Sequence, residues 1–414
     1  MNHKVVDHLF RHQYGRMVAI LSRIFGLAHL ELVEDAIQDT FIKATLQWRN
    51  EIPEHPEAWL TQAAKNRVID LLRQINAERD RYQKISHGSI AMEISELFLD
   101  HEVEDSQLRM IFVACHPALS REEQIAFALK TLSGFSMKEI AAALLQKEET
   151  IKKRLIRARK KIKQQQVAFT YPDPEEIDDR MAAVLQVIYL IFNEGFHSTK
   201  ADSLISKDVC GEAMRLCKLL LVKERFRSGS LYALFALCCF HASRLESKIS
   251  TENEIVNLQY QDRSKWYGPL MILGNNAMQK SLEYDDQSVY HYEAAIAAEH
   301  LKAPQFESTD WTRILALYHD LYALQPNDQV LLSIASVYLQ MDQTDQAKHF
   351  LDRIPTHSLH HREYLLSGCY AEYYLKSGNI EHALTEINKA IQLCSNDLER
   401  AYLRKKKKQI ANEV

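Results

Sequence analysis

Apolar side chains recur every three to four residues along most of the chain, and this is the spacing of one buried face of an α-helix. The first such stretches cover residues 4–25, Leu30–Trp48 and Glu57–Gln74. Residues that break helices are scarce, since the 414 residues include only 11 Gly and 9 Pro. We therefore expect an all-α protein.

A strongly basic stretch, Lys147–Lys163, has the clearest helical pattern. Its buried stripe would consist of Ile151, Leu155, Ala158 and Ile162. A short Ala- and Leu-rich helix over Phe135–Gln146 precedes it, and the pair resembles a helix-turn-helix that places its second helix on DNA. Six cations are the candidate DNA contacts: Lys152, Lys153, Arg154, Arg157, Arg159 and Lys160. A merely solvated basic face explains this stretch, taken alone, equally well.

The helix over Leu30–Trp48 combines a buried side with a compact acidic patch on the opposite side. The patch consists of Glu34, Asp35, Gln38 and Asp39. Such a patch is either a solvated helix face or a docking surface for a basic partner.

The third helix carries a row of polar and cationic residues that we expect to be exposed. Pro56 suits the first helical position because its missing N–H would have no partner there. The row consists of Lys65, Asn66, Arg67 and Arg73, and Trp59 stands beside it. Aromatic and cationic side chains together are typical of single-stranded DNA binding, although Trp59 also suits a place in the core.

Two motif blocks resemble those of a known family. The block L-V-E-D-A-I-Q-D-T-F at 32–41, followed by P-E-A-W-L-T-Q-A-A-K-N-R-V-I-D-L-L-R at 56–73, resembles region 2 of a bacterial sigma factor of the extracytoplasmic-function group. The segment Leu119–Lys163 is similar to region 4. Two blocks in the right order are more specific than a lone helix-turn-helix, and they favour DNA as the partner of the basic helix.

The resemblance implies four parts of the chain. Region 2 would span residues 1–75, an acidic linker residues 76–107, region 4 residues 108–168, and a helical C-terminal extension residues 169–414, beginning near the turn Y-P-D-P at 171–174. The family's roles would then fall on the patches above. Residues 34–39 would bind core RNA polymerase, Trp59 and the row on the third helix would bind the −10 element, and the basic helix would read the −35 element.

The C-terminal extension has its own helical pattern. A helix is expected to run into N-E-G-F at 193–196 and to be broken by Gly195, and Leu231–Leu245 is apolar nearly all round. Asp328–Ile354 and Glu363–Leu393 look like repeated helix pairs, as in tetratricopeptide repeats, which we place near residues 324–410. The order of motifs resembles the sigma-factor subgroup labelled ECF42-like or YlaC-like.

Charge is unevenly distributed along the chain. Residues 1–168 hold 25 Lys and Arg against 22 Asp and Glu, whereas the remainder holds 26 against 33. This distribution suits DNA contact by the N-terminal part alone. The seven cysteines are irregularly spaced, and no secretory signal or membrane-spanning run is evident. We expect a cytoplasmic protein with reduced thiols and no membrane partner.

No motif of catalysis or metal binding is present, so we expect no catalytic residue, no metal and no cofactor. The nearest approaches to a metal-ligand cluster are His291 with Glu293, His360 with His361, and Cys238 with Cys239, and none has a zinc spacing. The run Arg404–Lys408 suits a solvated helix end better than a second nucleic-acid patch.

The sequence therefore predicts a sigma factor that directs promoter-specific initiation by core RNA polymerase. The C-terminal extension would regulate activity through a protein partner or an intramolecular contact. An alternative is a helix-turn-helix regulator with a sensing repeat domain that does not recruit polymerase. A third class, an enzyme in the C-terminal part, would require a metal or a deep polar pocket there.

Overall fold

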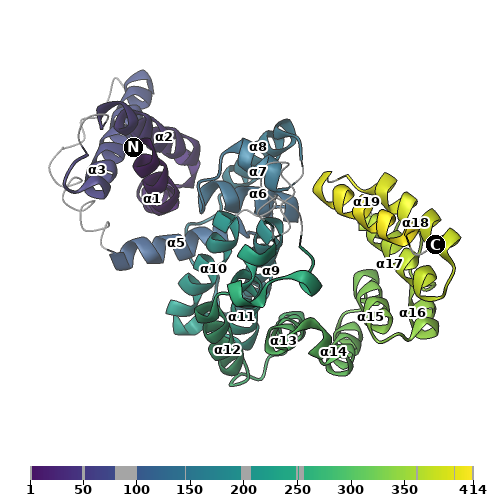
Figure 1. Cartoon of the computed structure of the whole chain (residues 1–414). Coiled ribbons are helices and arrows are strands. Elements are labelled where there is room, and N and C mark those ends of the chain that lie inside the picture. The colour runs from purple at the N-terminus through teal and green to yellow at the C-terminus, as the bar shows by residue number, and fades with distance from the viewer. Residues whose placement is uncertain are drawn as a thin grey trace. The chain divides into compact units, whose positions relative to one another are not determined.

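A computed structural model of the chain divides it into two compact units, residues 1–191 and 192–414 (Figure 1). The structure describes residues 2–48, 52–79, 100–144, 146–196, 207–248, 250, 256–359, 362–395 and 397–412. All regular structure in these ranges is helical, which confirms the expected all-α class. No helix within the described ranges is both long and apolar enough to cross a membrane.

The first unit begins with three packed helices. These are α1 (Asn2–Phe25), α2 (Leu30–Gln47) and α3 (Pro56–Arg79), with a short 3-10 turn, η1 (Leu27–His29), between the first two. Tyr14, Met17 and Leu21 of α1 are buried with Ile37 of α2 and Leu60 of α3. Pro56 is the first residue of α3, as predicted.

Within the described ranges, four further helices follow before this unit ends inside α9 (Ile177–Phe196). They are α5 (Asp100–Ala114), α6 (Arg121–Thr131), α7 (Met137–Ala143) and α8 (Glu148–Gln164). Ser120 and Glu123 cap the start of α6 reciprocally, with Glu123 Oε2 accepting from the Ser120 N–H at 2.8 Å. Both ends of the predicted linker are helical, because α3 continues to Arg79 and α5 starts at Asp100, and its residues 80–99 lie outside the described ranges.

The two groups of helices in the first unit pack on each other, chiefly through α1 against α5 and α6. The approach is closest at Gly15 of α1, where an added Cβ would lie 1.9 Å from the carbonyl oxygen of Leu132 at the end of α6. Arg23 of α1 also contacts α5, 2.5 Å from Glu102 and 3.7 Å from Asp105.

The second unit starts within α9 (Ile177–Phe196), which the prediction had ending at Gly195. That prediction is wrong, since the helix continues through Gly195 to Phe196. The glycine serves close packing instead: a Cβ there would lie 2.8 Å from the backbone nitrogen of Cys210 and 2.9 Å from its Sγ, on α10 (Lys207–Val222).

Helix α11 (Gly229–Ser243) is the central helix of the second unit. It packs on α10, α12 (Gly268–Ser281) and α13 (Val289–Lys302), and it is buried nearly all round, as expected for Leu231–Leu245. Short 3-10 turns connect neighbouring helices: η2 (Pro174–Glu176), η3 (Glu224–Phe226), η4 (Leu245–Lys248), η5 (Leu258–Tyr260), η6 (Arg263–Lys265) and η7 (Phe306–Ser308).

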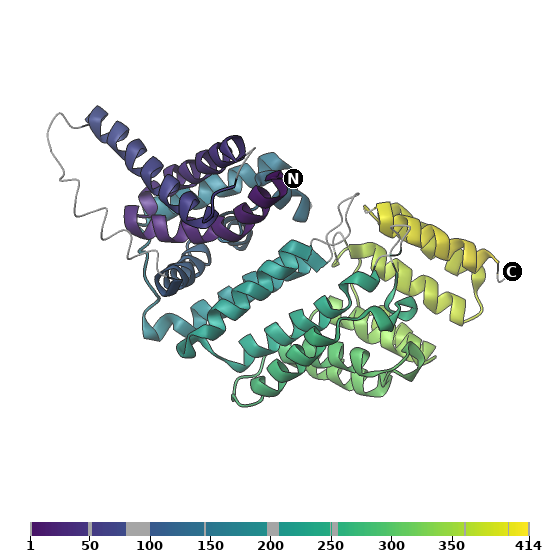
Figure 2. The same cartoon turned by 60° about the vertical axis from the view of Figure 1, so that its left-hand side comes forward.

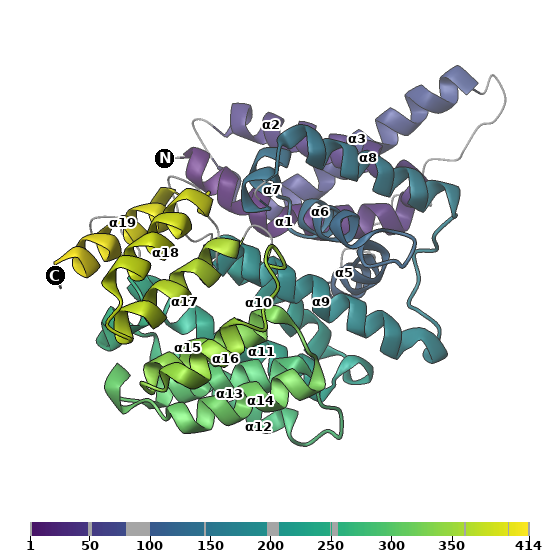
Figure 3. The same cartoon turned by 90° about the vertical axis from the view of Figure 1, so that its right-hand side faces the viewer.

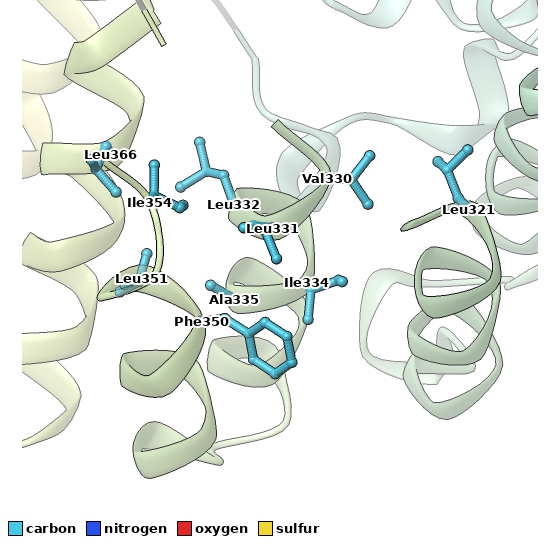
Figure 4. Packing of buried hydrophobic residues seen from close by; sticks show 10 residues of the cluster. All are labelled: Leu321, Val330, Leu331, Leu332, Ile334, Ala335, Phe350, Leu351, Ile354 and Leu366. Atoms are coloured by element: carbon cyan, nitrogen blue, oxygen red, sulfur yellow. The ribbon is translucent and has the colours of Figure 1, made fainter. Parts of the chain in front are cut away.

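The remaining helices of this unit pack mainly on their neighbours in sequence. They are α14 (Trp311–Leu324), α15 (Asp328–Gln340), α16 (Thr344–Leu351), α17 (Glu363–Lys376), α18 (Ile380–Leu393) and α19 (Asp397–Ala411). Figure 4 shows one shared core, in which Leu321 of α14, Ile334 of α15, Phe350 of α16 and Leu366 of α17 contribute to one cluster. In Figure 2, α18 and α19 lie side by side at the C-terminal end. The two predicted helix pairs are therefore present, as α15 with α16 and α17 with α18.

Candidate nucleic-acid and polymerase interface

Helix α8 is the basic helix that the sequence predicts. Ile151, Leu155, Ala158 and Ile162 are buried, as expected, and pack on α6 and α7. Lys161 Nζ contacts Glu123 Oε2 at 2.6 Å and so ties the end of α8 to the start of α6. Helix α7 spans fewer residues than predicted, and together with α8 it forms a helix-turn-helix.

The start of α8 lacks a side-chain cap. Lys147 occupies the N-cap position, and its side chain accepts no hydrogen bond from the helix. Glu148 and Glu149 in the first turn place negative charge where the helix dipole favours it.

Five of the six predicted cations are available on α8. Lys153, Arg157 and Lys160 are exposed on the face opposite the buried stripe, while Lys152 and Arg154 flank that face. Lys153 has one weak partner, Glu149, at 3.8 Å. A row of cations opposite a packed stripe suits phosphate and base contacts in a groove of DNA.

Arg159, the sixth cation, faces the interior of the unit and forms an ion pair with Glu34 of α2. The side chain of Arg159 is 22% exposed and that of Glu34 only 2%. The sequence placed both residues on exposed faces, and this is wrong for both. Helical spacing identifies the face of each helix but not the second helix that covers it.

The Glu34 carboxyl is only partly compensated in this position. Burial raises its pKa above the usual value, and the charges of Arg159 and Lys130 offset only part of that effect. Its Oε1 and the Nε of Arg159 are buried without a hydrogen-bond partner. An ion pair of this kind is costly to bury and sensitive to the loss of either member.

The other members of the predicted acidic patch lie at the surface of α2. Asp35 and Asp39 are exposed and Gln38 is half-buried, and they line an open hollow of about 630 Å³ together with Glu31. Burial and the neighbouring charge of Glu31 raise the pKa of Asp35. The surface therefore keeps a concentration of carboxylates that a basic partner can neutralise.

A second open groove, of about 720 Å³, runs between α2 and α3 beside this hollow. Trp59, Asn66 and Arg67 line it, so the structure brings three of the predicted residues together. Trp59 is half-buried and meets Trp48 edge to face, with ring centroids 5.2 Å apart. The Trp59 ring therefore packs against the core and also lines the groove.

The remaining residues of the row on α3 differ in position. Lys65 is buried, with 4% of its surface exposed, so its predicted exposure is wrong because this position faces the packed side of α3. Arg73 is exposed two turns further along, with Asp70 at 3.4 Å.

Sequence reasoning also missed Lys43, an exposed cation that lines the same groove from α2. Lys43 follows Asp39 by four residues and so lies on the same face of the helix. This spacing could have identified it from the sequence.

One ion pair links the acidic hollow to the groove. Arg67 Nη2 and Nε contact Asp39 Oδ2 at 2.8 and 3.0 Å. The two side chains are 41% and 48% exposed, so solvent screens the pair and its contribution to stability is small, about 0–1 kcal/mol. It orients Arg67 along the groove at little energetic cost.

The residues considered above as metal ligands are used for helix capping and core packing where the structure describes them. His291 helps to cap α13 through Ser288, and Cys238 and Cys239 are buried in α11. His360 and His361 lie outside the described ranges. Elsewhere in the described part of the chain, no three His, Cys, Asp or Glu side chains come together as metal ligands would.

Family models match three segments of the chain. Sigma-70 region 2 matches residues 9–78, Sigma-70, region 4 matches residues 109–162, and a family of unknown function (DUF6596) matches residues 180–282. The first segment contains the region 2 block, and the second covers the region 4 block up to residue 162. The resemblance to sigma regions 2 and 4 is thereby confirmed.

Two relatives extend the comparison. The uncharacterized protein R00370 of Rhizobium meliloti is 32% identical over 395 residues, which cover 93% of this chain and 91% of that protein. The ECF RNA polymerase sigma factor SigE of Mycolicibacterium smegmatis is 27% identical over 157 residues, which cover 38% of this chain and 60% of that protein. No solved structure matches the chain.

Proposed function

This chain belongs to the same family as R00370 of Rhizobium meliloti and carries the two domains of an ECF-type sigma factor, and we propose that it directs core RNA polymerase to specific promoters. The observation that carries the proposal is the combination of two surfaces in one unit. A helix-turn-helix presents a free basic face, and a region 2 domain presents an acidic hollow beside a Trp-lined groove. A simple repressor needs only the first of these surfaces.

Helix α8 is proposed to read the −35 element in the major groove. Lys153, Arg157 and Lys160 stand where a recognition helix faces the bases. Arginine and lysine there can donate to guanine O6 and N7, while Lys152 and Arg154 on the flanks bind phosphates. Arg159 is paired with Glu34 and is therefore left out of this set.

The groove between α2 and α3 is proposed to hold the −10 element as it melts. The half-buried Trp59 lines the groove and offers an aromatic ring for stacking, Asn66 offers hydrogen bonds, and Arg67 with Lys43 offers positive charge. Binding unstacked bases offsets part of the cost of opening the duplex. Arg73 continues the cationic face beyond the groove, whereas the buried Lys65 supports α3 from inside.

The acidic hollow on α2 is proposed to dock on the polymerase. Asp35, Gln38 and Asp39 line it together. Carboxylates concentrated on one exposed surface favour a basic partner and speed the encounter with it. Catalysis of RNA synthesis would remain with the polymerase.

A double charge reversal, Asp35→Lys with Asp39→Lys, tests the docking surface. The expected result is at least tenfold weaker binding of core polymerase, about 1.4 kcal/mol, by titration of a labelled chain. The matched control is Glu283→Lys with Asp285→Lys, which makes the same charge change on an exposed loop of the second unit. Equal binding of core polymerase by both variants and the wild type would contradict the proposed docking surface.

The second unit is proposed to regulate this activity by binding a partner. Its helix pairs resemble tetratricopeptide repeats, which present extended surfaces to other chains. The match to R00370 runs through this unit, so the extension is shared within the family. We propose membership of the ECF42-like subgroup on the same grounds.

A further inference from the structure

The second unit carries an open groove that none of the surfaces assigned above includes. It lies between the segment around η5 and helices α17 and α19, and its volume is about 780 Å³. Figure 3 shows α17, α18 and α19 as neighbouring helices of this unit. Ligand pockets typically have volumes of roughly 300–1,000 Å³, so the groove is large enough to hold several side chains of a partner.

Polar contacts hold the walls of this groove together. Asn257, at the start of η5, donates from Nδ2 to the hydroxyl of Tyr402 on α19 at 2.5 Å. Lys406 Nζ of α19 contacts Glu372 Oε2 of α17 at 2.6 Å. Burial lowers the pKa of Lys406, but the charge of Glu372 outweighs that effect and raises it, so this cation stays charged. The walls are therefore positioned before a partner binds, which reduces the entropic cost of binding.

The interior of the groove is partly apolar. Leu375 of α17 and Leu398 of α19 line it and are half-buried. Tyr260 of η5 also lines it, and this side chain is 67% exposed. Apolar surface that is gathered in a groove and bordered by polar residues is typical of a binding site. A partner with an apolar side chain could cover this surface and remove it from water.

Helix α19 makes one border of the groove strongly basic. Lys405 is exposed and lines the groove, and the exposed Lys408 follows it by three residues and so lies on the same face of α19. Among the described residues that line the groove, Glu372 is the one carboxylate, and Lys406 neutralises it. The helix dipole explains a cation in the last turn but not an excess of positive charge beside an apolar groove. The groove therefore complements a ligand that is both acidic and apolar.

Two observations favour an acidic polypeptide over a nucleic acid as this ligand. Residues 169–414 hold 26 Lys and Arg against 33 Asp and Glu, so the overall charge of this part of the chain repels a polyanion such as DNA. The two leucines also offer contacts that a phosphate backbone does not use. A peptide with a few carboxylates around an apolar residue fits both the basic border and the apolar interior.

We propose that this groove binds a short acidic segment of a partner protein. Carboxylates of the segment pair with Lys405 and Lys408. An apolar side chain of the segment packs against Leu375, Leu398 and Tyr260. The proposal rests on the proposed function and deepens it, because it gives a chemical identity to the partner through which the second unit would regulate initiation.

Fluorescence anisotropy of a labelled peptide, titrated with the full chain, tests the proposal. The probe is the capped peptide E-E-L-D-E-L-E-E. The matched control peptide, Q-Q-L-N-Q-L-Q-Q, keeps the length and the apolar residues but carries no charge. We expect saturable binding of the acidic probe and at least tenfold weaker binding of the neutral peptide. Equal binding of the two peptides, or binding of neither, would overturn the proposal.

A double charge reversal, Lys405→Glu with Lys408→Glu, locates the binding site. Both side chains are exposed, so circular dichroism should be unchanged while the acidic probe binds at least tenfold more weakly. The matched control is Lys280→Glu with Arg313→Glu, which makes the same charge change at exposed positions of α12 and α14. Lys280, like Lys408, lies in the last turn of its helix. An equal loss of affinity in both double variants would indicate attraction to net charge alone and refute the site.

Two further variants separate the groove from the basic helix α8. Tyr260→Ala should weaken binding of the acidic probe at least threefold, because it removes an exposed ring from the groove. Lys153→Glu with Arg157→Glu, which reverses exposed cations of α8, should leave the affinity for the probe within twofold of the wild-type value. If the probe is lost in the α8 variant and retained in the α19 and Tyr260 variants, the proposal is wrong.

Promoter DNA and core polymerase distinguish the remaining outcomes. The complex of core polymerase with the α19 double variant should bind promoter DNA as tightly as the wild-type complex. A tenfold loss there would assign the groove to nucleic acid and contradict the proposal. Failure of the wild-type chain to bind core polymerase, with the peptide results as expected, would contradict the proposed function and still support the peptide site.

Discussion

At the scale of single residues, exposure separates Arg157 from Arg159 although they stand two positions apart on one helix. Arg157 is exposed opposite the buried stripe, whereas Arg159 is paired with Glu34. The hydrophobic stripe of α8 was predictable because four apolar residues at helical spacing need only one buried face. The partner of Arg159 was not, since it comes from a segment 125 residues away.

Arg157→Ala should weaken promoter binding by the chain in complex with core polymerase. Loss of a base contact costs about 1–3 kcal/mol, and loss of a phosphate contact lowers the salt slope by about one. Fluorescence anisotropy with promoter DNA at several salt concentrations measures both effects. Arg404→Ala, at an exposed position on α19, makes the same charge change and should leave binding unchanged. An equal loss in both variants would indicate a general effect of net charge.

Acidification should stabilise the folded first unit through Glu34. Burial raises the pKa of Glu34 in the folded chain, so the folded chain binds a proton there more tightly than the unfolded chain, in which the carboxyl is exposed. This contribution to stability is present below the usual value of 4.5 and is lost as the pH rises through the raised pKa. The groups that face Glu34 are Arg159, Lys130, Asp35 and Tyr14.

Asp105, which contacts Arg23 of α1 from α5, has a lowered pKa and stays charged across this window. The free energy of unfolding, measured by urea titration at several pH values, should therefore fall less or rise more with increasing pH in Glu34→Gln than in the wild type. The same pH dependence in both proteins, or the opposite difference, would contradict the sign.

At the scale of helices, the sequence predicted where the helices lie along the chain better than it predicted how they pack. It located α1, α2, α3, α8 and the pairs α15–α16 and α17–α18, because helical periodicity is a local property. It misjudged Gly195, since low helix propensity predicted a break where the structure uses the missing Cβ. It also placed Lys65 at the surface, because the pattern of α3 leaves several polar positions near its buried edge.

Gly195→Ala should destabilise the second unit by about 1–3 kcal/mol, because the methyl group would overlap the backbone nitrogen and Sγ of Cys210. Urea unfolding followed by circular dichroism measures the change in the free energy of unfolding. Gly211→Ala, which meets open space on α10, should be neutral or stabilising by up to about 1 kcal/mol. The packing role of Gly195 would be refuted by equal stability of the two variants.

At the scale of the whole molecule, the order of the domains along the chain supports the proposed function. A region 2 domain, a region 4 domain and a helical extension follow one another, and R00370 matches across 93% of the chain. The sequence predicted this order from two motif blocks. It could not predict that the first two domains cover parts of each other's surfaces, since that depends on complementary shapes such as Gly15 against Leu132.

The proposed function requires the chain to confer promoter specificity on core RNA polymerase. Run-off transcription measures this property with the purified chain, core enzyme and a library of genomic promoter fragments from the source organism. We expect transcripts that start at defined positions, require the chain and fall steeply with salt, and we expect Arg157→Ala to reduce them. If the chain yields no transcript on any fragment beyond those of core enzyme alone, the proposed function is wrong.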